Sequence, residues 1–233
     1  DATNYQLPHD WDGPDGDRLE TVDLTDVLDD DYEVWVNTDV HGHTLAAEIG
    51  RYPEAMERQD SEGTGYVLPA AEFDAHREYL DEHCSEFYVH SERGRKWIPR
   101  FYDGDDFLAL LAWYITEGSV YTSARKQFGE NLGGSSTTIN IAQDAITDGG
   151  EGGDHTAIGE LLDRMGFEYY VDEQGYQFTS RLFGRWLEQT CGEDSFEKRI
   201  PELVFELSRA QKERFLATLV AGDGDRQVDS WRY

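Results

Sequence analysis

Two apolar segments that each end in an acidic residue and a glycine place the strongest constraint on the fold of this chain. The first is LLAWYITEG at residues 110–118, and the second is FLATLVAGDG at residues 215–224. Their acids, Glu117 and Asp223, are 106 residues apart. Because similar segments at a fixed spacing indicate an internal repeat, the sequence predicts two equivalent helices, each ended by its glycine.

Small residues predict how these two helices pack. Ala112 and Thr116 are four residues apart in the first helix, as are Thr218 and Gly222 in the second. This spacing puts each pair on one face of its helix, and small side chains on facing surfaces let two backbones approach closely. We therefore expect the helices to lie side by side with their acidic ends together.

That arrangement predicts a metal site. A carboxylate at the C-terminal end of a helix is unfavourable because the helix dipole is negative there, and two carboxylates at adjoining ends also repel each other. A divalent cation offsets both costs, and carboxylate oxygens suit Mg²⁺. Metals held in this way support phosphodiester hydrolysis. Glu117 and Asp223 are thus the predicted ligands of Mg²⁺ (or Mn²⁺).

Helices and strands are predicted to alternate between the two segments. Asp103 can cap the first helix, and Ser208 with Gln211 forms a capping box that predicts the start of the last one. The apolar patterns between them indicate two strands, a helix, a hairpin and a further helix, at residues 120–128, 135–143, 155–167, 168–180 and 181–192. The predicted order is helix, two strands, helix, two strands, helix, then a connector and the second motif helix.

The two motifs and this order resemble the LAGLIDADG homing endonucleases over roughly residues 103–225. The resemblance implies an α+β fold with an αββαββα core, of which this chain holds the complete first half and only the first helix of the second half. It also implies a saddle of strands that reads a long DNA target. One metal-binding acid comes from each motif helix, at Glu117 and Asp223, which are followed by Gly118 and Gly224. The family most often has Asp at the first of these positions.

The segment KRIP at residues 198–201 extends the resemblance, because intein-borne members often carry it ahead of the second motif. The resemblance gives Lys198 a role in the active site, where an ammonium can stabilise the charge that develops on a phosphate or assist water deprotonation. Gln143, at the end of the second predicted strand, is a candidate for ordering water there. Intein and free-standing origins both remain open.

The sequence suggests four regions. We expect an irregular acidic arm at residues 1–31, an accessory α+β region at 32–100, the first half-core at 101–195, and a connector with the second motif helix at 196–233. The rest of the second half-core would come from a missing chain segment or from an intein host protein. Without it, we expect the chain to bind and cut DNA poorly.

The candidate DNA contacts are polar or basic. A basic cluster in the accessory region and outward-facing positions of the first two strands can reach phosphates or base edges. An ordinary solvated sheet face is the alternative for any one strand residue. The candidates are Arg93, Arg95, Lys96, Arg100, Arg125, Lys126, Thr138 and Asn140.

The net charge bears on possible partners and on the environment. The chain has 49 acidic and 20 basic residues, which give a formal charge of -29 and alone argue against nucleic acid or an anionic membrane. With only four lysines, however, the pattern is typical of a protein adapted to very salty cytoplasm. Two isolated cysteines and the lack of an 18-residue apolar run predict a cytoplasmic protein with no membrane partner.

Three other motifs do not support a site. HGH at 41–43 has no third ligand in view, and GDGDRQVD at 222–229 lacks the glycine of a calcium loop. GGEGGD at 149–154 lacks the lysine of a phosphate loop. The leading hypothesis is a Mg²⁺-dependent, site-specific double-stranded DNA endonuclease. The alternative is a catalytically inactive DNA- or RNA-binding module of the same fold, of the maturase or regulator type.

Overall fold

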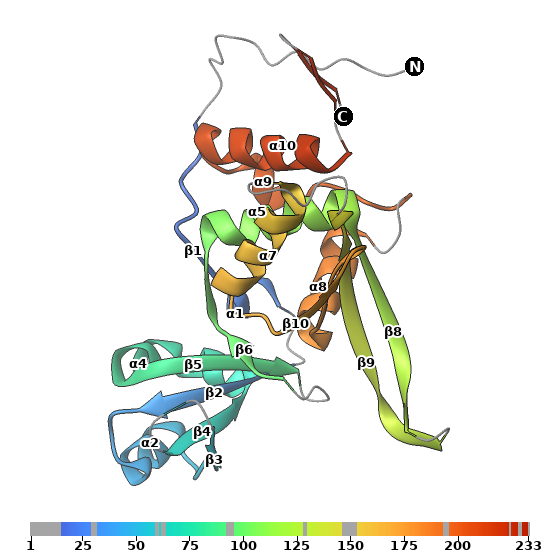
Figure 1. The fold of residues 1–233 in the computed structure, drawn as a ribbon. Coiled ribbons are helices and arrows are strands. Elements are labelled where there is room, and N and C mark those ends of the chain that lie inside the picture. The colour runs from blue at the N-terminus through green and yellow to red at the C-terminus, as the bar shows by residue number, and fades with distance from the viewer. Residues whose placement is uncertain are drawn as a thin grey trace. The chain divides into compact units, whose positions relative to one another are not determined.

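The computed structural model describes residues 15–28, 32–58, 61, 64–91, 96–127, 130–145, 153–192, 196–223, 225–227 and 230–232. Of these, residues 91, 124–127, 130–135, 223, 225–227 and 230–232 are described by their backbone alone. The chain divides into two compact units. Residues 1–22 and 103–233 form the core unit, and residues 23–102 form the inserted unit. Both combine helices with antiparallel strands, so the predicted α+β class is confirmed (Figure 1).

From Gly104 to Cys191, the helices and strands of the core unit follow the predicted order. Asp103 caps the first helix by accepting hydrogen bonds from the backbone N–H groups of Asp105 and Asp106, as predicted. The order is α5 (Gly104–Glu117), β8 (Gly118–Gln127), β9 (Glu130–Ala142), α7 (Asp154–Arg164), β10 (Tyr169–Asp172), β11 (Gly175–Thr179) and α8 (Arg181–Cys191). The four strands form one antiparallel sheet in the order β10-β11-β9-β8.

One face of this sheet is the apolar core. Strand alternation places Val120, Ile139 and Phe178 in one paired row, and all three are buried. Helix α8 packs on this face, where a Cβ on Gly184 would meet the side chains of Thr137, Val120 and Ile139. The glycine therefore lets the helix lie close to β8 and β9.

The second motif helix is α10 (Arg209–Asp223), which begins directly after Ser208 as the capping box predicts. The Gln211 backbone N–H donates to Ser208 Oγ at 3.4 Å. A short helix, α9 (Glu202–Phe205), lies within the predicted connector. The expectation that only a helix of the second half is present was wrong, because the antiparallel pair β12 (Asp225–Gln227) and β13 (Ser230–Arg232) follows α10.

The predicted irregular arm at 1–31 also needs correction. Residues 21–27 form β1 (Thr21–Asp23) and α1 (Leu24–Val27), and Asp23 caps α1 by accepting from the Thr25 N–H. Strand β1 pairs with β7 (Phe101–Asp103). The many acids of this segment suggested a loop, but one of them provides the cap that starts a helix.

The inserted unit is a five-stranded antiparallel sheet with helices. Its elements are α1, β2 (Tyr32–Thr38), α2 (Gly42–Ile49), β3 (Glu54–Glu57), β4 (Thr64–Pro69), α3 (Ala70–Ala75), α4 (Arg77–His83), β5 (Cys84–Ser91) and β6 (Ile98–Pro99). The strand order is β3-β4-β2-β5-β6. Helices α3 and α4 meet at His76. Strands β5 and β6 pair Val89 with Ile98, and residues 92–95 between them lie outside the described residues.

Candidate metal and DNA site

Helices α5 and α10 lie side by side, parallel, and in the register of the sequence repeat. At their N-terminal ends, Gln211 Nε2 donates to Asp105 Oδ1 at 2.9 Å. At their C-terminal ends, a Cβ on Gly222 would overlap the side chain of Thr116. Both pairs are 106 residues apart in sequence, so equivalent positions of the two motifs contact each other. The predicted packing is confirmed for Thr116 and Gly222, and it stays a prediction for Ala112 and Thr218.

This register brings the ends that carry the two acids together. Glu117 is the last residue of α5 and Asp223 is the last residue of α10. Each directly follows a member of the Thr116–Gly222 contact. The Glu117 side chain is partly exposed, while the side chain of Asp223 and residue Gly224 lie outside the description. The structure therefore places the two backbones at one site.

Gly118 makes the turn from α5 into β8 without a break. Its N–H donates to the carbonyl oxygen of Tyr114, which closes the last helical turn. A Cβ at this position would overlap the backbone of Tyr114. The predicted role of Gly118 in ending the helix is confirmed. As a metal contact it stays a prediction.

Lys198 lies at the same end of α5. Its Nζ donates to the Tyr114 carbonyl oxygen at 2.6 Å and lies 3.1 Å from the centroid of the Tyr114 ring. An ammonium at this place interacts favourably with the negative end of the helix. Burial lowers the pKa of Lys198 to about 8, although the nearby Cys191 acts in the opposite direction. Part of the Lys198 population is therefore neutral at pH 8.

Gln143 lies at the corresponding end of the sheet. The register of β8 and β9 pairs Gly118 with Ile141, and Gln143 directly follows Ala142, the last residue of β9. Its side chain is buried, and its backbone N–H donates to the Gln174 carbonyl at 3.0 Å. The structure thus places Gln143 and Glu117 at one end of the same strand pair.

The sheet face opposite the apolar core is polar, and its described side chains are almost all uncharged. Ser119, Asn140, Gln177 and Tyr170 form one paired row across all four strands. A second row contains Tyr121, Thr138 and Thr179. Thr138 and Asn140 are partly exposed while Ile139 and Ile141 are fully buried, which confirms their predicted outward direction. Asp172 is the one charged side chain among those described on this face.

The other candidate DNA contacts stand differently. Lys96 is exposed. Arg93 and Arg95 lie outside the described residues, as do the side chains of Arg125 and Lys126, which belong to β8. None of these four is tested by the structure.

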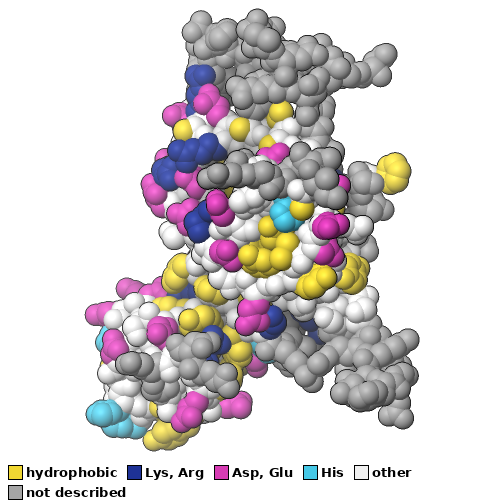
Figure 2. Space-filling view, in the orientation of Figure 1, with side chains coloured by type: hydrophobic (Ala, Val, Ile, Leu, Met, Phe, Trp, Pro, Cys, Tyr) yellow, Lys and Arg dark blue, Asp and Glu magenta, His cyan; other side chains and the backbone are white. Residues whose placement is uncertain are grey.

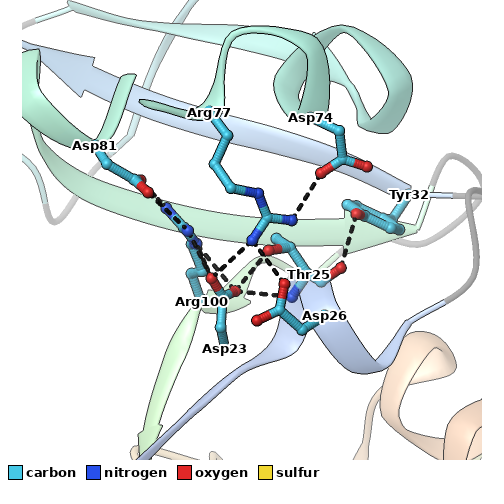
Figure 3. A network of polar contacts seen from close by, with 8 residues as sticks. All are labelled: Asp23, Thr25, Asp26, Tyr32, Asp74, Arg77, Asp81 and Arg100. Carbon is cyan, nitrogen blue, oxygen red and sulfur yellow. Dashed lines mark hydrogen bonds and ion pairs between the residues drawn. The ribbon is translucent and has the colours of Figure 1, made fainter. Parts of the chain in front are cut away.

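Arg100 is a correction. It is 2% exposed, and its guanidinium donates to Asp23 Oδ2 at 2.9 Å and to Asp81 Oδ1 at 2.5 Å (Figure 3). The rings of Phe73, Phe87 and Phe101 surround it. A side chain this enclosed cannot contact DNA, so Arg100 is a structural residue of the inserted unit.

Charge pairing dominates the environment of this arginine. Burial alone lowers the pKa of Arg100, but its hydrogen bonds to Asp23 and Asp81 raise it more. Burial likewise raises the pKa of Asp23, and its hydrogen bonds to Arg100 and Thr25 outweigh this and lower it. Arg77 also pairs with Asp23, Asp26 and Asp74 in the same network.

The donors at the helix ends fit a hard divalent cation in their chemistry, because each end contributes one carboxylate beside backbone carbonyls. Within the part of the chain that the structure describes, no group of three or more His, Cys, Asp or Glu side chains is arranged so that it could hold a metal ion. Glu117 and Asp223 stay the predicted ligands of a cation, whose coordination water and substrate oxygens would complete.

Sequence reasoning missed Tyr114 and the pairing of Asp105 with Gln211. Tyr114 belongs to an apolar helix and carries no polar pattern that marks it. The second pair did have a signal, since the repeat spacing that relates Glu117 to Asp223 also relates Asp105 to Gln211.

Comparison of the sequence with protein-family models gives no match. The chain also matches no curated protein. Among the described helices, none has the length and apolar character needed to cross a bilayer.

Proposed function

We propose that this protein is a metal-dependent, site-specific double-stranded DNA endonuclease of the LAGLIDADG homing type. The observation that carries the proposal is the contact between equivalent positions of α5 and α10. Because Thr116 meets Gly222, the two acidic helix ends adjoin. A carboxylate at the C-terminal end of a helix interacts unfavourably with the helix dipole, and a divalent cation bound between two such ends would offset this.

Glu117 and Asp223 would hold Mg²⁺ or Mn²⁺ between the helix ends. Such a cation, when bound, lowers the pKa of water and neutralises charge on a phosphodiester. In the hydrolysis, the water oxygen forms a new bond to phosphorus and one ester P–O bond breaks. Lys198 would supply a positive charge for the developing negative charge, and Gln143 would orient water.

The polar sheet face supports DNA as the substrate. Ser119, Asn140, Gln177 and Tyr170 offer donors and acceptors in one row, as direct readout of base edges requires. Among the described side chains of this face Asp172 is the one carboxylate, so these side chains repel phosphates little. In molar salt, long-range attraction is screened, so short-range contacts of this kind would carry more of the binding.

The test incubates the full-length protein that carries this chain with double-stranded DNA that spans the uninterrupted insertion site of the host gene, in molar KCl with Mg²⁺. We expect cleavage at that site. Glu117→Gln and Asp223→Asn keep side-chain shape but remove the charge, and each should slow cleavage by roughly 100-fold or more. Undiminished cutting by both variants would overturn the metal role, and no cutting by the wild type would overturn the nuclease.

The polar face also supports a second candidate, a DNA- or RNA-binding module that does not cleave. Binding through this face requires neither Glu117 nor Asp223. This candidate predicts that Asn140→Ala with Gln177→Ala weakens binding while the two acid variants bind like the wild type. It gains support if the wild type binds the site tightly in Mg²⁺ and leaves it uncut.

A further inference from the structure

Tyr114 contacts Lys198 with two different groups. Its carbonyl oxygen accepts a hydrogen bond from Lys198 Nζ at 2.6 Å, and its ring lies under the same nitrogen at 3.1 Å from the centroid. The tyrosine side chain is fully buried in α5. An ammonium over an aromatic face is attracted by the negative charge of the ring surface. The ring and the carbonyl together define one position for Nζ.

The hydroxyl of Tyr114 fixes the loop that carries Lys198. It donates to the carbonyl oxygen of Gly192 at 3.0 Å. Gly192 ends α8 with a φ of 94°, and a Cβ there would overlap the Glu197 carbonyl. The Arg199 N–H donates to the Cys191 carbonyl at 2.8 Å, which closes the loop at its other end. The loop is therefore held at both ends, and Tyr114 holds the end at Gly192.

We propose that Tyr114 is the positioning residue of Lys198, seating its ammonium at the C-terminal end of α5 beside Glu117. This inference rests on the proposed function, because it assigns Tyr114 a part in the reaction through Lys198. Tyr114 contacts neither the substrate nor a metal in this scheme. It fixes the position of the Lys198 ammonium relative to the bound phosphate. A small displacement of a charged group in an active site slows catalysis strongly.

The position of Lys198 can be measured without any activity. The chain has four lysines, Lys96, Lys126, Lys198 and Lys212. With lysine labelled with ¹³C at the ε carbon, the NMR spectrum should show four signals. The ring current of Tyr114 should move the ε protons of Lys198 upfield of the other three. Lys198→Met identifies that signal by removing it.

Variants at Tyr114 separate the ring from the hydroxyl. Tyr114→Phe keeps the ring, so the upfield shift should persist, while Tyr114→Leu should abolish it. Tyr102→Phe, a buried tyrosine of the inserted unit, is the matched control and should leave the spectrum unchanged. If Tyr114→Leu fails to fold by circular dichroism, the wild type and Tyr114→Phe still decide the point. The absence of any upfield lysine signal in both overturns the inference.

Cleavage kinetics test the functional half separately. In single turnover, Tyr114→Leu should slow cutting by about tenfold or more with unchanged DNA affinity. Combined with Lys198→Met it should add nothing to the loss caused by Lys198→Met alone. Wild-type rates in a folded Tyr114→Leu would overturn the inference and leave the nuclease intact. If the wild type never cuts, the nuclease fails, and the NMR result alone decides whether Tyr114 positions Lys198.

Discussion

The ammonium group of Lys198 is partly buried. Burial lowers its pKa to about 8 from a usual value of 10.5. Between these two pH values the unfolded chain binds a proton that the folded chain does not, so the free energy of unfolding rises with pH there. Below pH 8 the lysine is charged in both states, and the cost of burying the charge is constant.

Replacing Lys198 with Met removes this contribution. We expect wild-type stability, measured relative to Lys198→Met, to be lowest below pH 8 and to rise steadily up to about pH 10.5. Urea unfolding of both proteins across this range gives the difference. Other titrating groups contribute equally to the stability of both proteins, so their contributions cancel in the difference. One such group is Cys84, whose pKa is raised to about 11 by burial. A difference that is flat with pH would mean that Lys198 is solvated.

Arg100 is the residue whose role the sequence concealed. It lies in a run of basic residues, which is typical of a phosphate-binding surface. Its partner Asp23 is 77 residues away, and sequence proximity gives no information about a contact at that distance. Lys198 had a signal in the sequence, because the resemblance places the KRIP segment ahead of the second motif, and its role in the reaction stays a prediction.

Removal of the Arg100 guanidinium should destabilise the inserted unit strongly. Arg100→Met leaves Asp23 charged in a partly buried place, which costs about 3–5 kcal/mol. Arg51→Met is the control, since the Arg51–Glu72 pair is more exposed and should cost less than about 1 kcal/mol. Equal losses in chemical denaturation would contradict this account.

Asp23 also makes the stability depend on pH. Its pKa is lower in the folded protein than the usual value of 3.8, so the carboxylate stabilises the fold above pH 3.8. This contribution is lost as the pH falls through the pKa of Asp23 in the folded protein.

The pairing of α5 with α10 shows what a repeat can predict about elements. The spacing gave the equivalence of the two helices, and the small residues gave the face on which they meet. The parallel register follows from both, because equivalent residues can meet only if the helices run in one direction. The hairpin β12–β13 and the four-residue helix α1 were missed because so few residues carry no apolar period.

The contact between α5 and α10 determines whether Gly222→Ala raises or lowers the free energy of unfolding. In an exposed helix this change stabilises by about 1 kcal/mol, but here the new Cβ meets Thr116. We expect a loss of about 1–3 kcal/mol instead. Thr116→Gly removes the obstructing atoms, so the double variant should lose less than the two single losses added together. Ala221→Ser, at an exposed neighbour, should change the urea midpoint little. A stabilised Gly222→Ala would show that the helices are apart.

The charge of -29 predicts a strong dependence of the whole molecule on salt. Acidic side chains are spread over the visible face of each unit (Figure 2), and their mutual repulsion opposes the compact state. Salt screens this repulsion. We therefore expect the thermal midpoint to rise from dilute buffer to molar KCl, by about 2–4 °C for each kcal/mol gained. Sucrose at the same osmolality should give a smaller rise. Equal midpoints in dilute and molar KCl would contradict the prediction.

The two ends of the core unit that flank the inserted unit are joined by a backbone hydrogen bond. The Gly104 N–H donates to the Glu20 carbonyl at 2.8 Å. The chain therefore leaves the core unit and returns to it at positions that are one hydrogen bond apart. Just before this junction, Gln211 holds the backbone of Leu19 from both sides, at 2.9 Å and 2.8 Å. The 80 residues of the inserted unit therefore leave the core unit and rejoin it at a single point of its backbone.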